Sequence, residues 1–514
     1  MMMDGLCEHL KYNYLTMKIV NQFLFLIISQ FFLIQLANCD GDSIFKNTYF
    51  VILSQPNQAD LAMAHQTRKL LQNDLENQEG ITIHSNKKVF LVSEDISYHG
   101  SWTIFPVISE LINSLKLTKK KWFVFLDAKS RVNLKILRDV LETHKNDHFL
   151  GQSLEDPDHT VIHHYADPKE LQYPNFEAGF VLSASLVEEL ALSLAEFGHE
   201  LDWIPSDFSI DPQYEFAKAL KMRNKDLNLR HDSRFCCASS NGINNGGDKE
   251  CAIFRENGDR NNQTSDEDLM ILLLAKNTLF AVKTCEKFHQ ERLPVIKDTW
   301  GQAALQIMYF SEITDPEIGT IQLDGVTNTE RGHCHKTMEI IKYFNKEASK
   351  NDWKWLVIAD DDTILSVNQM LKFLHSFDPN VPVHAGQRYG YGIATGKYGY
   401  DYVTGGGGMI FSIEMTRRIV KNLGLCSCPS KDTPDDMHLG MCMSHLGLEI
   451  VHSSRFHQAR PEDYSQKLLH CQDPISFHKF WNSNPHQVYK KWFESHDQML
   501  KQYKYNQNHR HQEL

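Results

Sequence analysis

Three consecutive aspartates, Asp360, Asp361 and Asp362, are the residues of this sequence best suited to chemistry. They follow a short apolar run, residues 356–359, that is typical of a strand buried on both faces. Ligands of open α/β sheets bind beyond the carboxyl ends of the strands, which is where these side chains are expected. Adjacent carboxylates repel one another unless a cation or hydrogen-bond donors lie between them. An acidic surface turn is the alternative, but the strand before the triplet and the helical pattern after it favour a metal site.

Two further segments supply groups that such a site would need. Asp435 and Asp436 open a helical pattern after Pro434. A carboxylate in a first helical turn is usually a cap, which accounts for one of the pair and leaves the other available as a base. Gly405 and Gly406 begin a run of four glycines between two apolar segments. Glycine permits close approach of a ligand to the backbone, although a tight turn alone would also explain the run.

One histidine and one arginine complete the candidate set. His457 follows a strand-like segment, and a neutral imidazole is a good manganese ligand. The chain has 26 histidines, so the position of His457 supports this assignment more than its identity does. Arg292 lies in a helical segment, where its guanidinium could pair with a diphosphate or with an acidic side chain. An ordinary surface arginine explains the sequence equally well.

The totals fit a multidomain globular protein. At 514 residues the chain exceeds one ordinary core, and its hydrophobic share of 42% and charged share of 23% are those of folded domains. The net charge is −12, and no long Lys/Arg-rich tract is present. This balance argues against a nucleic-acid partner.

The sequence contains one structural plan twice. Residues 44–230 (the first copy) and 269–500 (the second copy) each alternate strand-like and helix-like segments, which predicts two tandem α/β domains with mostly parallel sheets. The intervening stretch 231–268 is rich in Asn, Gly, Asp and Ser, and predicts a linker in which Cys236, Cys237 and Cys251 form disulfides of undetermined pairing. Three blocks match in the same order between the copies: 121–129 with 354–362, 176–183 with 403–412, and 205–207 with 434–436.

The differences between the copies predict different functions. Ala128 and Lys129 stand where the second copy has Asp361 and Asp362, and a lysine there would repel a divalent cation. Ala62 stands at the position of Arg292. The first copy is therefore expected to keep the fold without the chemistry of the second copy.

The two ends of the chain predict its compartment. Residues 1–39 contain a basic segment and an apolar run of signal-peptide length, although a type II signal anchor is also consistent with them. The tail, residues 501–514, ends in His511, Gln512, Glu513 and Leu514, which resembles the signals read by the KDEL-type retrieval receptor. The 11 cysteines and a glycosylation sequon at Asn262 fit an oxidising compartment. We expect a soluble protein of the endoplasmic reticulum lumen, with a membrane-anchored form as the alternative.

The second copy also resembles a known family, the Fringe-related β-1,3-glycosyltransferases, which are inverting enzymes with a GT-A (Rossmann-like) fold. The resemblance covers about residues 270–480 and rests on motifs in a fixed order: 280–284, 288–289, 292–293, 299–300, 354–355, 360–362, 404–406, 434–436 and 456–457. It implies two tandem GT-A-like domains, of which the first is degenerate. That first domain is then expected to bind no nucleotide, and to position the acceptor protein or brace the second domain.

The resemblance also implies roles for individual residues. Asp362 would bind Mn²⁺, Asp361 and Arg292 would contact the nucleotide sugar, and Asp436 would be the catalytic base. Asp360, Asp435, Gly405 and Gly406 would line the substrate site. The family places its metal histidine two residues after the Phe456-His457 pair, where this chain has Ala459. Either His457 takes that role or the metal has fewer protein ligands.

Taken with the degenerate first copy and the retrieval-like tail, the resemblance implies a reaction. The expected donor is UDP-glucose, and the expected acceptor is O-linked fucose on thrombospondin type 1 repeats, joined in β-1,3 linkage. UDP-GlcNAc or UDP-galactose remain alternative donors, because the choice of sugar depends on the shape of the pocket. A non-catalytic lumenal lectin or folding factor is the alternative of another class.

Overall fold

The computed structural model describes residues 43–81, 88–96, 99–114, 122–169, 171–197, 207–237, 250–255, 265–329, 332–393, 399–480 and 482–510. Several predicted features lie outside these residues: the signal segment 1–39, Asn262, residues 205–206 and the terminal residues 511–514. The chain divides into two compact units, residues 1–47 and 48–514. Of the first unit only the end is described, including a 3-10 turn at Ile44–Asn47. Within the described ranges, no helix combines the length and the apolar character needed to cross a membrane.

The larger unit contains two major sheets, one in the first half (residues 48–255) and one in the second half (residues 265–510). The first sheet has the strand order β10-β5-β8-β3-β1-β2, with β8 antiparallel to both of its neighbours. Its strands are β1 (Thr48–Leu53), β2 (Val89–Leu91), β3 (Trp122–Asp127), β5 (Phe149–Gly151), β8 (Phe180–Ser183) and β10 (Arg230–His231).

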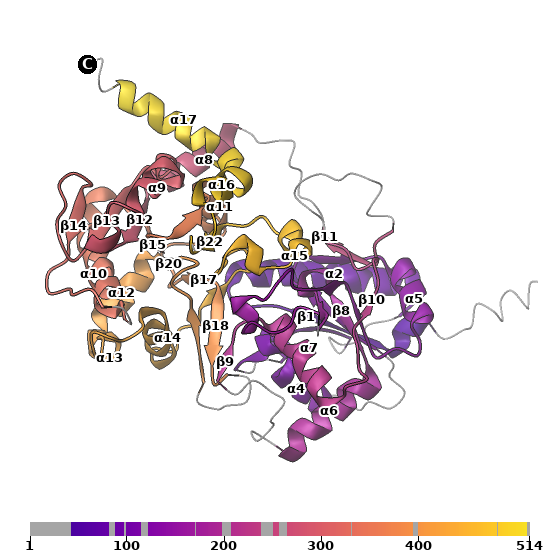
Figure 1. Cartoon of the computed structure of the whole chain (residues 1–514). Helices are drawn as coiled ribbons and strands as arrows, with labels where there is room; N and C mark the ends of the chain where they lie inside the picture. The colour runs from indigo at the N-terminus through magenta and orange to yellow at the C-terminus, as the bar shows by residue number, and fades with distance from the viewer. Residues whose placement is uncertain are drawn as a thin grey trace, which may run out of the picture. The chain divides into compact units, whose positions relative to one another are not determined.

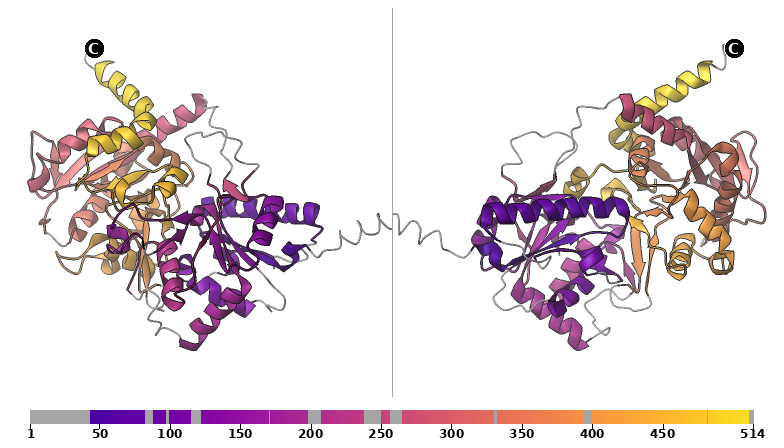
Figure 2. Two further views of the ribbon diagram at one scale, coloured as in Figure 1. Left: turned by 45° about the vertical axis from the view of Figure 1, so that its right-hand side comes forward. Right: turned by 180° about the vertical axis from the view of Figure 1, so that it is seen from behind.

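Helices cover both faces of the first sheet (Figures 1 and 2). Alternate strand residues such as Val51 and Phe123 pack in one apolar cluster with side chains of three of these helices, α4, α6 and α7. The opposite face lies under α2, which begins after its N-cap Asn57. Because successive strand residues point to opposite faces, a strand buried on both faces is expected to be apolar on both, as β1 is after Thr48 and β3 is before Asp127. The helices are α2 (Gln58–Glu79), α4 (Phe105–Ser114), α5 (Leu134–Thr143), α6 (Ala184–Phe197) and α7 (Pro212–Arg223).

The second sheet has the order β14-β13-β12-β15-β20-β17-β21. One face packs against α9, α11, α16 and α17, and the other packs against α10, α12 and α14. Its strands are β12 (Thr278–Lys283), β13 (Ile307–Ser311), β14 (Thr320–Gln322), β15 (Trp355–Asp360), β17 (His384–Gly386), β20 (Met409–Ser412) and β21 (Val451–His452). The helices are α8 (Ser265–Lys276), α9 (Leu293–Asp298), α10 (Cys334–Asn351), α11 (Val367–Leu374), α12 (Ile413–Lys421), α14 (Asp435–His445), α16 (Pro485–Trp492) and α17 (Glu494–Arg510).

The two sheets correspond strand by strand, except that β14 has no counterpart. Both contain parallel neighbours in the middle, one antiparallel strand beside them, and a final parallel pair. The register also agrees, because the β1–β3 pairing ends at Leu53 opposite Asp127 and the β12–β15 pairing ends at Lys283 opposite Asp360. The prediction of an α/β fold with two tandem domains is confirmed.

Part of the segment predicted as a linker belongs to the first half. Strand β11 (Ile253–Arg255) pairs antiparallel with β4 (Ser130–Val132), directly after the turn that follows β3. In the second half, β22 (Ser476–His478) pairs in the same way with β16 (Thr363–Leu365). A disulfide between Cys236 and Cys251 lies next to β11.

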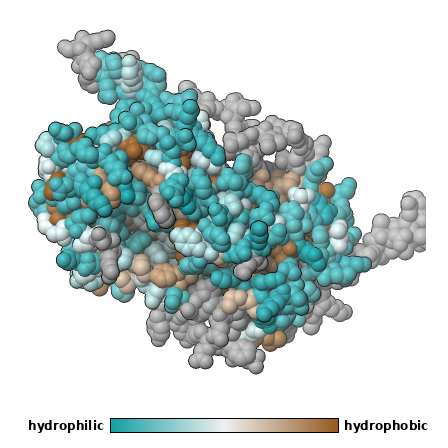
Figure 3. All heavy atoms as spheres, in the orientation of Figure 1, coloured by the Kyte–Doolittle hydropathy of each residue, from teal (hydrophilic) through white to brown (hydrophobic). Residues whose placement is uncertain are grey.

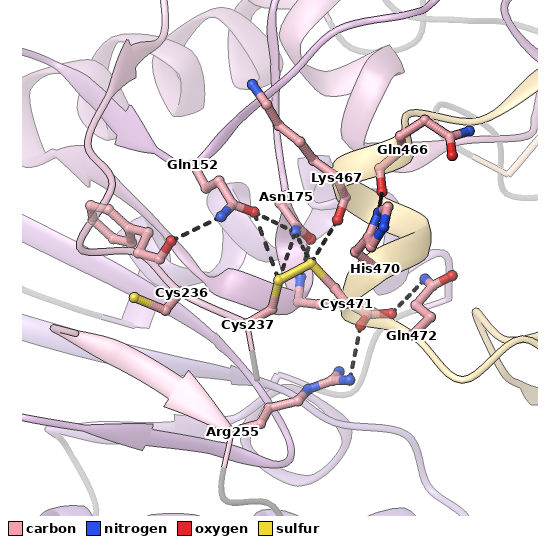
Figure 4. Close-up of a disulfide and its surroundings, with 12 residues drawn as sticks. Gln152, Asn175, Cys236, Cys237, Arg255, Gln466, Lys467, His470, Cys471 and Gln472 are labelled. Atoms are coloured by element: carbon pink, nitrogen blue, oxygen red, sulfur yellow. Dashed lines mark hydrogen bonds and ion pairs between the residues drawn. A yellow bond between two sulfur atoms is a disulfide. The ribbon is translucent and has the colours of Figure 1, made fainter. Parts of the chain in front are cut away.

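A strand pairing and a disulfide are among the connections that join the halves within this unit. Strand β9 (Phe208–Ser209) of the first half pairs with β18 (Arg388–Tyr391), which also pairs with β19 (Tyr400–Val403) (Figure 1). A disulfide links Cys237 to Cys471 at the end of α15 (Gln466–Cys471), where the Asn175 side-chain amide lies 3.2 Å from the Cys471 sulfur (Figure 4). The face shown in Figure 3 is mainly hydrophilic, as expected when most apolar side chains are used in the two cores.

Candidate functional site

The aspartate triplet lies at the carboxyl end of β15, as the sequence predicted for a ligand site. Asp360 is the last residue of the strand, and Asp361 and Asp362 form the turn into β16. The antiparallel pairing of β16 with β22 sets Thr363 opposite His478. This register places the imidazole of His478 next to the triplet, although His478 lies 116 residues after Asp362 in the sequence. His478 Nε2 lies 3.1 Å from Asp362 Oδ1 and 3.8 Å from Asp360 Oδ2.

The histidine is oriented for the carboxylates by its second nitrogen. His478 Nδ1 lies 3.1 Å from the carbonyl oxygen of Gln458, which only accepts a hydrogen bond. Nδ1 therefore carries the hydrogen, and Nε2 faces Asp360 and Asp362, an arrangement typical of metal-binding histidines. Burial alone would lower the pKa of His478, but its hydrogen bond to Asp362 and the charges of the two aspartates raise it. The same negative potential would attract a cation.

The donor atoms of Asp360, Asp362 and His478 lie within 4.8 Å of one another, and two carboxylates with one imidazole fit a divalent transition metal. Gly406 makes room for this arrangement, because a Cβ at that position would lie 2.3 Å from His478 Nδ1. A second cluster of potential ligands, Cys334, Cys428 and His438, is not comparable, because its two cysteines form a disulfide.

Arg292 and Asp361 form the side of the site next to β12. Arg292 Nη1 lies 2.7 Å from Asp361 Oδ1 and 3.0 Å from Asp362 Oδ2, and its guanidinium stacks on the ring of Phe288. Asp361 also accepts a hydrogen bond of 2.7 Å from Thr284 Oγ1. Burial raises the pKa of Asp361 to about 6. Because both oxygens of Asp361 are bonded inside the protein, its geometry is that of a residue that positions Arg292.

The two acidic residues of the triplet that flank Asp361 differ from it in their surroundings. Burial would raise the pKa of Asp362, but the hydrogen bond to His478 and the charge of Arg292 lower it to about 2. Asp360 faces Lys283, whose Nζ lies 3.1 Å from Asp360 Oδ1. Asp362 is therefore ionised at neutral pH, and Asp360 is held by a buried cation on its other side.

Lys283 also determines the roles of the two aspartates on α14. Its ammonium pairs with Asp435, which accepts a further hydrogen bond of 2.6 Å from Thr337 Oγ1. Burial would raise the pKa of Asp435, but the charge of Lys283 lowers it to about 2. Asp435 is therefore part of a buried ion pair. Lys283 was not among the predicted site residues, although a lysine at the end of a buried, mainly apolar strand is a sequence signal for a functional role.

Asp436 has the surroundings of a base. Its Oδ1 accepts a hydrogen bond of 2.7 Å from the amide of Met437, in the first turn of α14. Burial and the neighbouring charge of Asp435 raise the pKa of Asp436 to about 6. Among the described residues, Asp436 has no ion-pair partner comparable to that of Asp435. A carboxylate with this pKa can accept a proton near neutral pH.

The glycine run forms the turn between β19 and β20. Thr363 Oγ1 donates to the carbonyl of Gly406 at 2.8 Å, and the amide of Gly408 donates to the carbonyl of Gly405 at 2.9 Å. Gly408 has a φ of +96°, which favours glycine. A Cβ on Gly405 would lie 3.8 Å from Asp435 Oδ1, so Gly405 borders the site as expected.

The structure does not bring His457 into this cluster. Its Nδ1 lies 3.0 Å from the carbonyl of Ser476, its Nε2 lies 3.0 Å from Gln472 Oε1, and burial lowers its pKa to about 4. With both nitrogens bonded inside the core, the ring has no free atom for a metal. The Phe-His dipeptide of His457 occurs again at Phe477-His478, but also at Phe288-His289, so the dipeptide alone does not identify His478 as the histidine beside the triplet.

Comparison with known proteins identifies relatives of both halves. A family profile described as Fringe-like matches residues 104–213 and 273–507. A β-1,3-glucosyltransferase of Mus musculus is 38% identical over 454 residues, which cover 87% of this chain and 86% of the relative. The β-1,3-glucosyltransferase of Homo sapiens is 37% identical over 467 residues, which cover 89% of this chain and 87% of the relative. The β-1,3-N-acetylglucosaminyltransferase radical fringe of Xenopus laevis is 26% identical over 204 residues, which are 36% of this chain and 60% of the relative.

Proposed function

Because this chain belongs to the Fringe-like family and is a UDP-sugar-dependent β-1,3-glycosyltransferase, we propose that it transfers glucose from UDP-glucose to O-linked fucose on thrombospondin type 1 repeats. The observation that carries this proposal is the convergence of Asp360, Asp362 and His478 beside a separate carboxyl of raised pKa, Asp436. A metal-binding acidic cluster and a distinct base are the two parts that an inverting transfer from a nucleotide sugar needs.

The names of the relatives favour glucose as the donor sugar. Two relatives that match most of the chain are β-1,3-glucosyltransferases, whereas radical fringe, an N-acetylglucosaminyltransferase, matches about a third of it. UDP-GlcNAc and UDP-galactose are the rival donors. A non-catalytic lectin would leave the cluster around Asp362 and the buried pair of Lys283 and Asp435 without a purpose.

We assign the metal ligands to Asp360, Asp362 and His478, and Mn²⁺ suits this donor set. When bound, the ion would act as a Lewis acid that offsets charge on the departing diphosphate. Arg292 is placed to bind a diphosphate oxygen beside it, because its guanidinium is half-buried and held by Asp361. Asp361 is in turn held by Thr284.

The two carboxylates of α14, Asp435 and Asp436, have different roles in the proposed reaction. Asp436 removes the proton from the 3-hydroxyl of fucose as this oxygen attacks the sugar carbon from the side opposite the leaving UDP, which converts the α bond of the donor into a β bond. Asp435 cannot share this task, because its proton affinity is lowered by Lys283. Lys283 thus keeps one carboxylate ionised, and the charge of that carboxylate raises the pKa of the other.

The activity test uses the whole chain with a fucosylated thrombospondin type 1 repeat, Mn²⁺ and a panel of UDP-sugars. We expect a mass increase of one hexose with UDP-glucose and little product with UDP-GlcNAc or UDP-galactose. Preferential transfer from either of the latter would contradict the proposed donor and keep the enzyme class.

The metal assignment has its own test, read by manganese binding in electron paramagnetic resonance. His478→Ala should weaken Mn²⁺ binding by at least roughly tenfold, because a ligand is lost. His457→Asn is the matched control, since His457 is also a buried histidine after a phenylalanine but bonds only to protein groups. The assignment is contradicted if His457→Asn is the variant that loses the metal.

We further propose that the protein resides in the lumen of the endoplasmic reticulum, on the basis of the predicted entry signal and the tail from His511 to Leu514. Deletion of these four residues should send active protein into the medium. Continued retention in cells would instead favour the membrane-anchored alternative.

A further inference from the structure

An aromatic row crosses the small sheet that the two halves share. Phe208 on β9 pairs with Tyr391 on β18, and Tyr391 pairs with Tyr400 on β19. Residues directly opposite one another in neighbouring strands project to the same face. The ring centroids of Phe208 and Tyr391 lie 5.2 Å apart, and those of Tyr391 and Tyr400 lie 5.8 Å apart. The three rings therefore form one continuous surface, contributed by both halves of the chain.

This face leads directly to Asp436. Helix α14 packs along β19, and a Cβ on Gly440 would lie only 2.5 Å from the Cβ of Tyr402. Tyr402 lies two residues after Tyr400 and so on the same face. Asp436 precedes Gly440 by four residues, which places both on the side of the helix that faces the strand. The charge of Asp436 accordingly contributes, after burial, to the raised pKa values of Tyr400 and Tyr402.

The row becomes more exposed with distance from Asp436. Tyr402 is 5% exposed, whereas Tyr391 and Phe208 are 39% and 40% exposed. On the opposite face of the same strands, Trp102 donates a hydrogen bond of 2.9 Å to Asp401 and packs close to Gly390, and a separate cavity lies beside them. The aromatic row is exposed at its outer end, and its inner end adjoins the proposed base.

We propose that Phe208, Tyr391 and Tyr400 form the docking surface for the acceptor glycoprotein, with its sugar at Asp436 and its protein surface on Phe208 and Tyr391. The inference rests on the proposed function, since it takes Asp436 as the base that the acceptor hydroxyl must reach. Half-exposed Tyr and Phe rings offer large, rigid apolar area and are frequent anchors of protein contacts. The bound protein must extend outward from the base, and the aromatic row is the apolar path that begins there.

This assignment gives the first half a specific role. Phe208 reaches the row only because β9 adds to the edge of β18. The first half would thus contribute directly to recognition of a folded acceptor, while the chemistry uses only residues of the second half. A small acceptor that carries the sugar alone would not reach Phe208.

The test measures binding and transfer with the full chain. Binding of an O-fucosylated thrombospondin type 1 repeat, without donor, should weaken by about tenfold in Phe208→Ala and in Tyr391→Ala, a usual loss for an anchoring ring. Tyr391→Phe should retain binding, because it keeps the ring. Tyr505→Ala is the control, since Tyr505 is also an exposed aromatic residue but lies on α17.

Transfer kinetics separate docking from a general loss of structure. The ratio of kcat/KM for the folded repeat to kcat/KM for a simple aryl fucoside should fall by about the same factor in Phe208→Ala. Unchanged binding of the repeat, or equal losses on both acceptors, would overturn the proposed surface. Because binding is measured without donor, a chain that binds the repeat through this row but transfers no hexose would contradict the proposed function alone.

Discussion

The two major sheets of this protein have the same strand order and register, yet different groups at their carboxyl ends. At the last paired position, the first half has Leu53 opposite Asp127, and the second half has Lys283 opposite Asp360. The buried cation that binds two carboxylates in the second half is therefore an apolar side chain in the first. The charge that would hold a counterpart of Asp435 is missing from that half.

The clearest contrast between the halves lies on β11 and β22, the strands that pair beside the carboxyl ends of β3 and β15. Register places Arg255 on β11 opposite Ser130, just as it places His478 on β22 opposite Thr363. Arg255 pairs with Asp127 at 2.9 Å and with Glu177 at 2.8 Å. Burial would raise the pKa of Asp127, but the charge of Arg255 lowers it.

The first half thus satisfies its remaining carboxylates with a fixed guanidinium, and Lys129 adds a second cation where Asp362 would bind a metal. In the second half, Asp360 and Asp362 also have cationic neighbours, Lys283 and Arg292, but the side chain on β22 is the imidazole of His478, a possible metal ligand, and not a guanidinium. The same backbone plan therefore carries a closed ion-pair network in the first half and, in the second, a cluster of side chains that could hold a metal ion, and the difference lies in a few side chains at strand ends.

Among the changes that the contrast suggests, Asp362→Ala should have the largest effect on the rate of sugar transfer. Transfer should fall by about three orders of magnitude, because a bound metal contributes several kcal/mol and about 1.4 kcal/mol is tenfold in rate. Lys129→Ala is the matched change in the first half and should leave UDP-glucose hydrolysis at the wild-type rate. Initial rates of both variants measure this difference. Manganese-dependent transfer that persists in Asp362→Ala would show that the metal is held elsewhere.

The second prediction separates the two aspartates of α14. Asp436→Asn should reduce kcat by roughly two or more orders of magnitude, the usual contribution of a general base, and leave donor binding nearly unchanged. Asp435→Asn should act on stability, because it leaves the buried Lys283 with one fewer partner, a loss of roughly 3 kcal/mol. Single-turnover rates and melting temperatures report the two effects. If Asp435→Asn loses more turnover and melts like the wild type, Asp435 is the base.

A smaller effect is expected from pH. Because burial and Asp435 raise the pKa of Asp436 to about 6, the base becomes protonated as the pH falls below that value. At pH 5, kcat should be about a tenth of its value at pH 7, since one unit below a pKa leaves about a tenth of the base ionised. Asp361 also has a pKa of about 6, but it supports Arg292, so its protonation should alter KM for the donor. A kcat that is constant from pH 5 to 7 at saturating donor would argue against Asp436.

Much of this architecture could be predicted from the sequence because local patterns encode it. The apolar run before Asp360 predicted that the triplet follows a buried strand, and the repeated blocks predicted two similar folds. The Fringe-like resemblance and the transferase class are confirmed by the relatives. Each of these features depends on residues close together in the chain or on motifs in a fixed order.

The remainder depends on pairing between distant segments, which local patterns do not contain. His457 and His478 both follow a phenylalanine near a strand, and only the register of β22 against β16 shows which imidazole meets Asp362. Strand β11 lies in a segment with little periodicity, and its pairing with β4 gives it its structure. The disulfide between Cys237 and Cys471 likewise could not be predicted from local sequence, because the two cysteines are 234 residues apart.

The smallest effect on activity is expected from the ion pairs of Arg255 with Asp127 and Glu177, which stand in the first half where the second half has its proposed metal site. Arg255→Met removes the partner of Asp127 and Glu177, so the free energy of unfolding should fall by roughly 3 kcal/mol, as for other broken buried pairs. The rate of UDP-glucose hydrolysis at a temperature where the variant is folded should equal that of the wild type. Combining Arg255→Met with Asp127→Asn and Glu177→Gln should recover most of the melting temperature, because no uncompensated charge then remains. A loss of hydrolysis in the folded Arg255→Met variant would mean that the first half takes part in donor chemistry, and the distinction between the two sheets would fail.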